Sequence, residues 1–213
     1  AAAFKTLGID FCCGGGATLA SVCAKKGIAL ADVAEALRYA DARGTSPQAR
    51  VEHWSPSFLA DYVVNEHHSY VRESLPVLRA FTQKVARVHG QRHPELVDIA
   101  GLFEQVATDL EGHMGCEEQI VFPAIKALAS GGPAPDTPLA DVLREMEGDH
   151  DAAGEAMRQI RALSSDFTPP PDACNTYRAA FVKLEEFEDD LHRHVHLENN
   201  VLFPKALALA PDA

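Results

Sequence analysis

The chain has 213 residues, of which 46% are hydrophobic and 23% are charged, and its formal net charge at pH 7 is −12. This length and apolar content suit one domain of ordinary size plus a small extra module. No apolar run approaches the roughly 18 residues of a membrane-spanning helix, which argues against a membrane protein. No basic stripe is present that could neutralise phosphates, which argues against binding to nucleic acid.

The cysteines and the first residues indicate a cytoplasmic protein. The chain has 5 cysteines, an odd count, and the adjacent pair Cys12 and Cys13 is unlike the disulfide framework of a secreted protein. Residues 1–5 lack the long apolar stretch of a signal peptide. Cys23 and Cys174 fall in segments with a helical pattern, where we expect them to serve as small apolar packing residues.

Residues 1–45 are predicted to form a small helical domain. The run Cys-Cys-Gly-Gly-Gly at residues 12–16 predicts a backbone turn that no helix would tolerate. Apolar residues at helical spacing then predict two short helices, over residues 17–26 and 31–43. Small and polar residues over 46–55 predict a linker to the rest of the chain.

Residues 56–213 contain four long stretches with helical apolar spacing and no strand pattern. Segments rich in glycine and proline separate the second stretch from the third and the third from the fourth. The predicted helices cover residues 56–88, 94–128, 138–163 and 173–208. Because the connections are short, neighbouring helices should be antiparallel. The sequence therefore predicts an all-α protein, an antiparallel up-down four-helix bundle preceded by a small helical domain.

One phrase, His-x-x-x-Glu-x-x-x-x-Phe-Pro, occurs twice in the predicted bundle, beginning at His113 and at His194. A further histidine precedes each copy at nearly the same spacing. His68 lies 45 residues before His113, and His150 lies 44 residues before His194. Each of the four helices therefore has a candidate ligand position, and the two hairpins place these positions at similar depth in the bundle.

These positions form a candidate metal site. Residues i and i+4 of a helix face the same way, about 6 Å apart, so each phrase presents an imidazole and a carboxylate to one point. A single His-x-x-x-Glu is more often a solvated helix pair than a ligand pair. The duplication, with its matched upstream histidines, favours metal binding. The six candidate ligands are His68, His113, Glu117, His150, His194 and Glu198.

The donor types narrow the choice of metal. Mixed imidazole and carboxylate ligands suit iron, manganese or zinc. Two glutamates are too few to serve two ions as terminal ligands, but each can bridge a pair of ions. Each ion then receives two imidazoles and two carboxylate oxygens, which leaves one or two positions for a bridging oxygen, water or a small ligand. Zinc would need only a lone tetrahedral site. We therefore predict two iron ions in a carboxylate-bridged, non-heme di-iron centre.

Other polar residues near the six have different predicted roles. His67, His89 and His196 do not share the helix face or the depth of the candidate ligands, so we do not expect them to bind the metal. Asp109 and Asp149 each lie beside a candidate ligand. They could orient an imidazole or line a route for a small ligand. The alternative is that both are ordinary surface charges.

The order of these ligands over four helices resembles the hemerythrin-like domain. The stretch Gly-Ile-Asp-Phe-Cys-Cys-Gly-Gly at residues 8–15 is similar to the short domain that precedes it in the RIC family, the iron–sulfur cluster repair di-iron proteins. The resemblance covers nearly the whole chain. Further phrases that fit this family lie at residues 72–76, 118–123, 168–171 and 197–204.

The resemblance implies a bacterial cytoplasmic protein of the nitrosative and oxidative stress response. Its di-iron centre, held by the six residues named above, would bind nitric oxide or another diatomic ligand. The protein would repair damaged iron–sulfur proteins by supplying iron, as a monomer or homodimer. The alternative is an enzyme, a di-iron nitric oxide reductase that forms nitrous oxide. A dioxygen carrier fits less well, because a carrier needs no pair of thiols.

The role of Cys12 and Cys13 has two interpretations. A thiol beside a glycine turn and a helix N-terminus can have a lowered pKa and act as a nucleophile or metal ligand. The two cysteines would then transfer iron or an NO group between the bundle and a partner. In the other interpretation they are packing residues of a tight turn.

Overall fold

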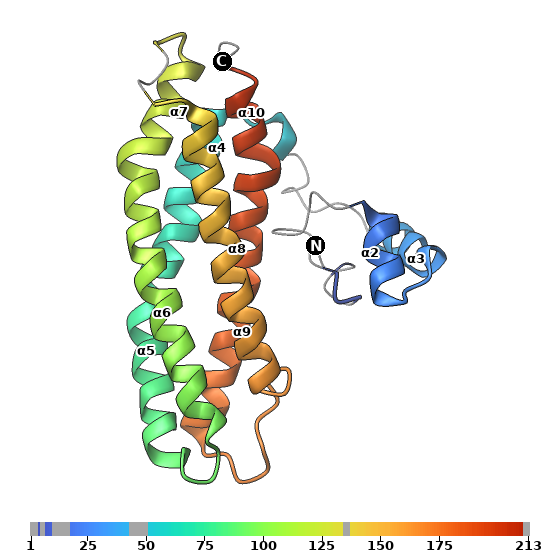
Figure 1. The fold of residues 1–213 in the computed structure, drawn as a ribbon, viewed down its shortest axis with the longest axis vertical. Helices are drawn as coiled ribbons and strands as arrows, with labels where there is room; N and C mark the ends of the chain where they lie inside the picture. The colour runs from blue at the N-terminus through green and yellow to red at the C-terminus, as the bar shows by residue number, and fades with distance from the viewer. Residues whose placement is uncertain (1–3, 5–6, 10–17, 43–50, 134–136, 211–213) are drawn as a thin grey trace.

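The computed structural model describes residues 4, 7–9, 18–42, 51–133 and 137–210. Within these ranges the regular structure is helical and contains no strand. Long helical rods lie side by side along the vertical axis of Figure 1, and the pair α2 (Leu19–Lys26) and α3 (Leu30–Ala42) stands apart from them. The predicted all-α four-helix bundle with a small helical unit at its N-terminal side is confirmed.

Three of the four rods contain a short π-helix between two α-helices. The first rod consists of α4 (Pro56–Tyr62), η2 (Val63–His68) and α5 (Ser69–His89). The second consists of α6 (Glu95–Cys116), η3 (Glu117–Val121) and α7 (Phe122–Ala129). The third is the single helix α8 (Leu139–Leu163). The fourth consists of α9 (Asn175–Leu197), η4 (Glu198–Leu202) and α10 (Phe203–Leu207).

The π-helices mark the positions of candidate ligands. Segment η2 ends at His68, η3 begins at Glu117, and η4 begins at Glu198. A π-helical turn bonds residue i to residue i+5, is rare, and occurs mostly at functional sites. The rod boundaries agree with the predicted helices to within a few residues, but the π-helices were not predicted, because apolar periodicity carries no signal for a single wider turn.

Buried apolar side chains form two layers, one on each side of these positions. One layer fills the space between α5, α6, α8 and α9, where the rings of Phe103 and Phe187 lie 5.5 Å apart. The other fills the end formed by α4, α7, α10 and the start of α8. Along α8, Met146 belongs to the second layer and Ala153 to the first, with His150 between them. The candidate ligands therefore lie where water is excluded from both sides.

The small N-terminal unit contains α2 (Leu19–Lys26) and α3 (Leu30–Ala42). The hydroxyl of Thr18 accepts a hydrogen bond from Ser21 N at 3.3 Å, which begins α2. Gly27 ends it with φ 68°, a left-handed conformation that glycine adopts without strain. Cys23 is buried, as expected for a packing residue. Cys12 and Cys13 lie outside the described residues.

The segment just before α4 packs against the bundle. Lys205 Nζ donates hydrogen bonds to the carbonyl oxygens of Glu52 (2.7 Å) and Trp54 (2.8 Å). The Trp54 ring also lies 5.1 Å from that of Tyr62. The predicted division into residues 1–45, 46–55 and 56–213 stays a prediction, but residues 51–54 contribute to the packing of the bundle.

The expectation for Cys174 was wrong. This residue precedes the first turn of α9 and is exposed, so it does not pack in a core. Its Sγ lies 3.2 Å from Nε2 of His89. The error arose because the predicted fourth helix began too early, at residue 173, and a helix-capping position faces solvent.

Candidate metal centre

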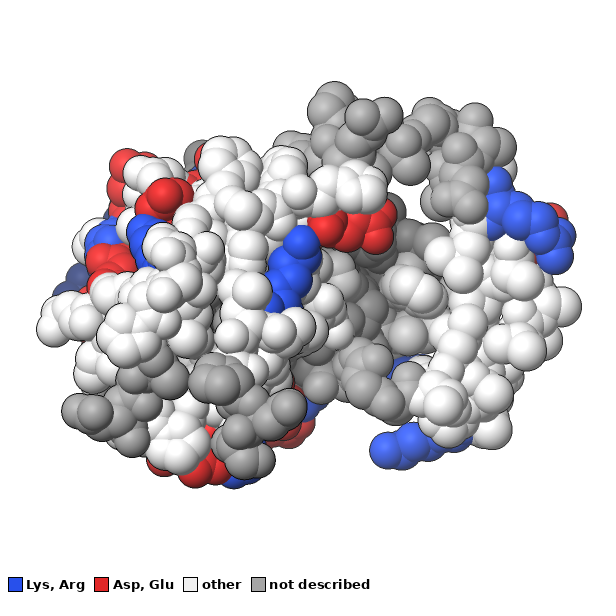
Figure 2. All heavy atoms as spheres, turned by 90° about the horizontal axis from the view of Figure 1, so that it is seen from above, with Lys and Arg blue, Asp and Glu red and all other residues white. Residues whose placement is uncertain are grey.

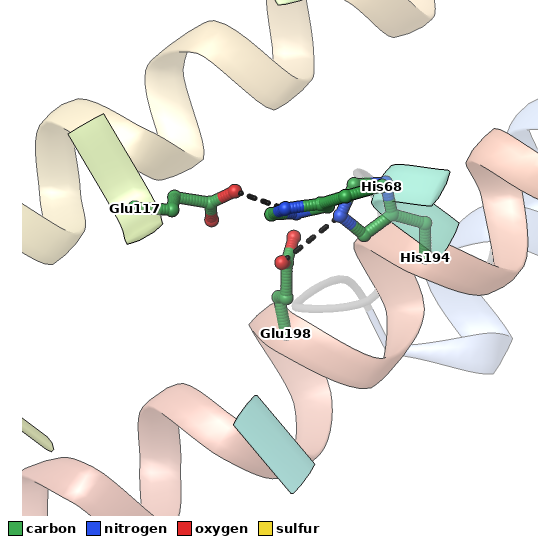
Figure 3. Close-up of side chains that lie close together, drawn as sticks. All are labelled: His68, Glu117, His194 and Glu198. Carbon is green, nitrogen blue, oxygen red and sulfur yellow. Dashed lines mark hydrogen bonds and ion pairs between the residues drawn. The ribbon is translucent and has the colours of Figure 1, made fainter. Parts of the chain in front are cut away.

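The four rods bring all six candidate ligands to one place in the middle of the bundle. Figure 3 shows His68, Glu117, His194 and Glu198 pointing toward one another from three different rods. Each of the six side chains is buried, and none of the residues is more than 5% exposed. Isolated charges at such positions would be costly, because burial removes the water that stabilises them.

The six residues form two overlapping groups. In each group one ligand atom per residue lies within 4.8 Å of all the others. The first group is His68, Glu117, His194 and Glu198, and the second is His113, Glu117, His150 and Glu198. Each group therefore offers two imidazoles and two carboxylates, and both glutamates are common to the two groups.

Each glutamate spans the two groups with its two oxygens. Oε2 of Glu117 lies 3.2 Å from Nε2 of His68, and its Oε1 lies 3.4 Å from Nε2 of His113. Oε1 of Glu198 lies 3.0 Å from Nε2 of His194, and its Oε2 lies 3.2 Å from Nε2 of His150. A carboxylate with this arrangement can bind one ion with each oxygen.

Several of these atoms lack hydrogen bonds, which supports a bound cation. Both carboxylate oxygens of Glu117, Oε2 of Glu198 and Nε2 of His68 are buried without a hydrogen-bond partner among the described residues. Buried polar groups are nearly always hydrogen-bonded, so exceptions at one point need an explanation. Two cations between the carboxylates would bind these atoms. The residues present therefore fit a pair of metal ions.

The charged groups of the site are arranged as pairs of histidine and glutamate. Burial opposes ionisation of Glu198, but the neighbouring His194 and His150 outweigh it and hold the pKa of this carboxyl well below its usual range. Burial also opposes protonation of His113, but the carboxylate of Glu117 outweighs it and raises the pKa of His113 to about 9. The carboxyl of Glu198 is therefore ionised at neutral pH, as a metal ligand requires.

Three of the four imidazoles are fixed on their outer side by a polar side chain. Nδ1 of His68 lies 2.7 Å from Oε1 of Glu118, which also accepts a hydrogen bond from Arg72 at 2.7 Å. Nδ1 of His150 lies 2.8 Å from Oδ1 of Asn199. Such partners set the tautomer and the orientation of a metal-binding histidine.

The third partner is Asp149, one of the two aspartates singled out in the sequence. Its Oδ2 lies 3.1 Å from Nδ1 of His113. Asp109, the other aspartate, is exposed, and the structure does not bring it into contact with a candidate ligand among the described residues. The roles of Glu118 and Asn199 as partners of a candidate ligand were not predicted from the sequence. Each residue directly follows a candidate ligand glutamate, so its equivalent position in the two copies of the repeat could have indicated this role.

The three histidines that the sequence analysis excluded as ligands, His67, His89 and His196, lie outside both groups of candidate ligands. His89 contacts Cys174, and His196 accepts a hydrogen bond from the side chain of Asn200 at 3.1 Å. His67 is buried, with Nδ1 within 3.1 Å of both carboxylate oxygens of Asp190. Its ring lies beside the candidate site rather than in solvent, which the sequence did not predict.

The outer surface is consistent with the charge of the sequence. On the face shown in Figure 2, Lys and Arg side chains occur in small separate groups rather than as a basic stripe. Within the part of the chain that the structure describes, the helices are too short or too polar to span a membrane.

The fold and the site together define a hemerythrin-like helical bundle with a candidate pair of metal positions in its core. Residues 59–206 match the family described as Hemerythrin HHE cation binding domain. Residues 1–41 match a second family, described as a domain of unknown function (DUF542).

Several curated proteins are similar over almost their whole length. The chain is 38% identical over 209 residues to the iron–sulfur cluster repair protein YtfE of Musicola paradisiaca, covering 97% of this chain and 90% of that one. It is 35% identical over 211 residues to a probable iron–sulfur cluster repair protein of Haemophilus influenzae, covering 96% and 89%. The chain therefore belongs to the hemerythrin HHE family and, within it, to the family of the iron–sulfur cluster repair proteins.

Proposed function

We propose that the protein holds two iron ions between its four rods, binds nitric oxide there, and repairs damaged iron–sulfur clusters by supplying iron. The observation that carries this proposal is the sharing of Glu117 and Glu198 between two groups of four ligand atoms. A single ion would leave two of the imidazoles without a role. The repair role is supported by the names of the relatives from Musicola paradisiaca and Haemophilus influenzae.

The surrounding residues suit this function. Two carboxylates offset half of the charge of two divalent ions, so the loaded site would keep a positive charge that attracts electron-rich ligands. Two apolar layers enclose the site, and exclusion of water strengthens every electrostatic interaction inside it. Ferrous ions there would supply coordination positions for a diatomic ligand. The histidines and glutamates position the ions, and Glu118, Asp149 and Asn199 orient three of the histidines.

Transfer to an acceptor protein tests the proposal. The iron-loaded protein is mixed with an iron–sulfur enzyme whose cluster has been damaged by nitric oxide, and recovery of the acceptor's cluster absorbance and activity is followed. We expect recovery with the wild type and little recovery with Glu198→Ala. His53 is exposed and outside the site, so His53→Ala serves as the control. Recovery with Glu198→Ala equal to that of the wild type would contradict the proposal.

The same preparation distinguishes iron supply from reduction of nitric oxide. The reduced protein is exposed to nitric oxide in the absence of an acceptor, and the gas phase is analysed for nitrous oxide. Iron supply alone predicts a spectral change with no sustained release of nitrous oxide. Release over many turnovers would instead identify a nitric oxide reductase at the same site.

A further inference from the structure

The four candidate ligand imidazoles differ in what binds their outer ring nitrogen, Nδ1. In three of them Nδ1 lies 2.7 Å from Glu118, 3.1 Å from Asp149 or 2.8 Å from Asn199. In His194, Nδ1 is buried and has no hydrogen-bond partner among the residues that the structure describes. A metal-binding histidine almost always donates this N–H to an acceptor, so His194 is the exception.

The internal repeat shows what replaces the missing partner. Asp149, the partner of His113, is the residue directly before the candidate ligand His150. The corresponding residue of the first half is His67, and it also lies next to the corresponding ligand, His194, but with a different contact. Its ring is stacked on that of His194, with centroids 5.5 Å apart and planes within 6° of each other. Because the N–H of an imidazole lies in the ring plane, a ring stacked on its face cannot accept that hydrogen bond.

His67 is also fixed in this orientation. Its Nδ1 lies 3.1 Å from both oxygens of Asp190, and its side chain is buried. The Tyr62 ring packs against its edge, with centroids 5.8 Å apart. The His67 ring therefore cannot turn to present a nitrogen to His194 without breaking the contact with Asp190.

These contacts make the two metal positions unequal. The position between His113 and His150 has a hydrogen-bond acceptor behind both imidazoles, whereas the position between His68 and His194 has one behind His68 only. Loss of such a partner typically lowers metal affinity by about 10- to 100-fold, because the ring becomes less basic and less well oriented.

We infer that the ion bound by His68 and His194 is the one that the protein releases, and that the ion bound by His113 and His150 is retained. This inference rests on the proposed function, since it names which ion supplies a damaged cluster. The ion leaves as Fe²⁺ to an acceptor that binds it, and no electron is transferred. Glu117 and Glu198 remain next to the retained ion, so the second, third and fourth rods would stay joined through it after the first ion has left.

The full-length ferrous protein, loaded to two ions per chain, is mixed with a chelator that absorbs visible light when it binds Fe²⁺. We expect two phases of equal amplitude, with the first about 10-fold faster than the second or more. Crystals of the protein stopped after the first phase are then measured at the iron absorption edge. The anomalous signal should be absent between His68 and His194 and present between His113 and His150. Release in a single phase, or loss of the other ion, overturns the inference.

Two variants test the physical cause. His67→Asn places an amide oxygen beside His194, and we expect the fast phase to slow by about 10-fold while the slow phase is unchanged. Asn199→Ala removes the partner of His150, and here the slow phase should become about 10-fold faster while the fast phase is unchanged. Circular dichroism checks that each variant is folded. If His67→Asn does not fold, Asn199→Ala decides alone, and an unchanged slow phase then overturns the inference.

The outcomes separate this inference from the proposed function. Two ions released in one phase, together with repair of an acceptor, would remove the inference and leave the function standing. Two phases of release without repair of an acceptor would support the inference and contradict the proposed function. Loading of a single ion per chain would remove both.

Discussion

The ring of Phe122 stacks on that of His68, with centroids 5.8 Å apart and planes 21° apart. The second copy of the repeated phrase makes the same contact, since Phe203 stacks on His150 with centroids 6.1 Å apart. The Phe-Pro of the repeat thus has a structural role. Its phenylalanine packs on a candidate ligand of the same half, closes one side of the site, and restricts the motion of the imidazole.

We expect Phe122→Ala to destabilise the protein by about 3–5 kcal/mol, because it opens a cavity in a fully packed layer beside His68. Urea unfolding of the metal-free protein measures this change. Ile120, 59% exposed on the adjoining π-helix, provides the control, and Ile120→Ala should cost less than about 0.5 kcal/mol. Equal costs for the two variants would show that Phe122 is not a packing element of the site.

The shared carboxylates should matter more for metal content than a single imidazole. We expect wild-type protein to contain about two iron atoms per chain, His113→Ala to lose mainly one, and Glu198→Ala to lose both, because Glu198 contacts imidazoles of both groups. Mass spectrometry of the metal in purified protein gives the counts. One zinc in the wild type, or full iron in both variants, would reject a di-iron centre.

The four rods and the convergence of the six candidate ligands could be predicted from the sequence, because both features depend on regular spacing along the chain. Helical periodicity identifies the buried face, and equal hairpin spans place His68 and His113, or His150 and His194, at the same depth. The π-helices could not be predicted, since a wider turn at Glu117 or Glu198 depends on packing of the whole bundle.

The side chains that surround the candidate ligands could not be predicted from the sequence either. Asp149 was a candidate partner through its position beside His150, yet it contacts His113 on another rod. His67 was expected to point away from the site, and only the packing of α9 against η2 shows that it stacks on His194. Relations between side chains of different rods need the three-dimensional packing, which periodicity does not contain.

Tyr177 should make the protein sensitive to alkaline pH. Burial raises the pKa of Tyr177 to about 12, and the charges of Glu95 and Asp172 add to the effect. In the unfolded chain the pKa of the phenol is about 10. The contribution of Tyr177 to the free energy of unfolding is therefore fully present below that pH, and it is lost as the pH rises toward 12. Unfolding by urea at pH 8 and at about 10.5 should show a decline that Tyr177→Phe reduces. Tyr39→Phe, at an exposed position, should keep the decline of the wild type.

A shortened chain tests the predicted domain boundary. A chain that starts at residue 47 should keep the bundle, both irons and the spectrum with nitric oxide, because the six candidate ligands all lie on the four rods. A chain that starts at residue 56 lacks Val51 and Trp54, which pack against the second apolar layer. We expect it to be less stable than the first by about 2 kcal/mol. Loss of metal from the longer of the two would show that the N-terminal unit is part of the site.

The last prediction concerns Cys12 and Cys13, which lie outside the described residues. We expect the double variant Cys12→Ser, Cys13→Ser to keep both irons and to bind nitric oxide, yet to fail in restoring a damaged cluster of an acceptor protein. The physical reason is that iron binding and iron transfer would depend on different parts of the chain. The ligands are all contributed by the bundle, whereas a thiolate near a helix N-terminus can carry iron or an NO group between the bundle and a partner.

The rate of iron release to a small chelator provides the internal control for this variant. If the thiols act only in transfer to a protein, release to the chelator should match the wild type while restoration of the acceptor is lost. Cys23→Ser is the matched substitution, because Cys23 is buried in the same N-terminal unit and is predicted only to pack. Full repair activity in the double variant would reduce Cys12 and Cys13 to packing residues and leave the bundle as the sole functional element.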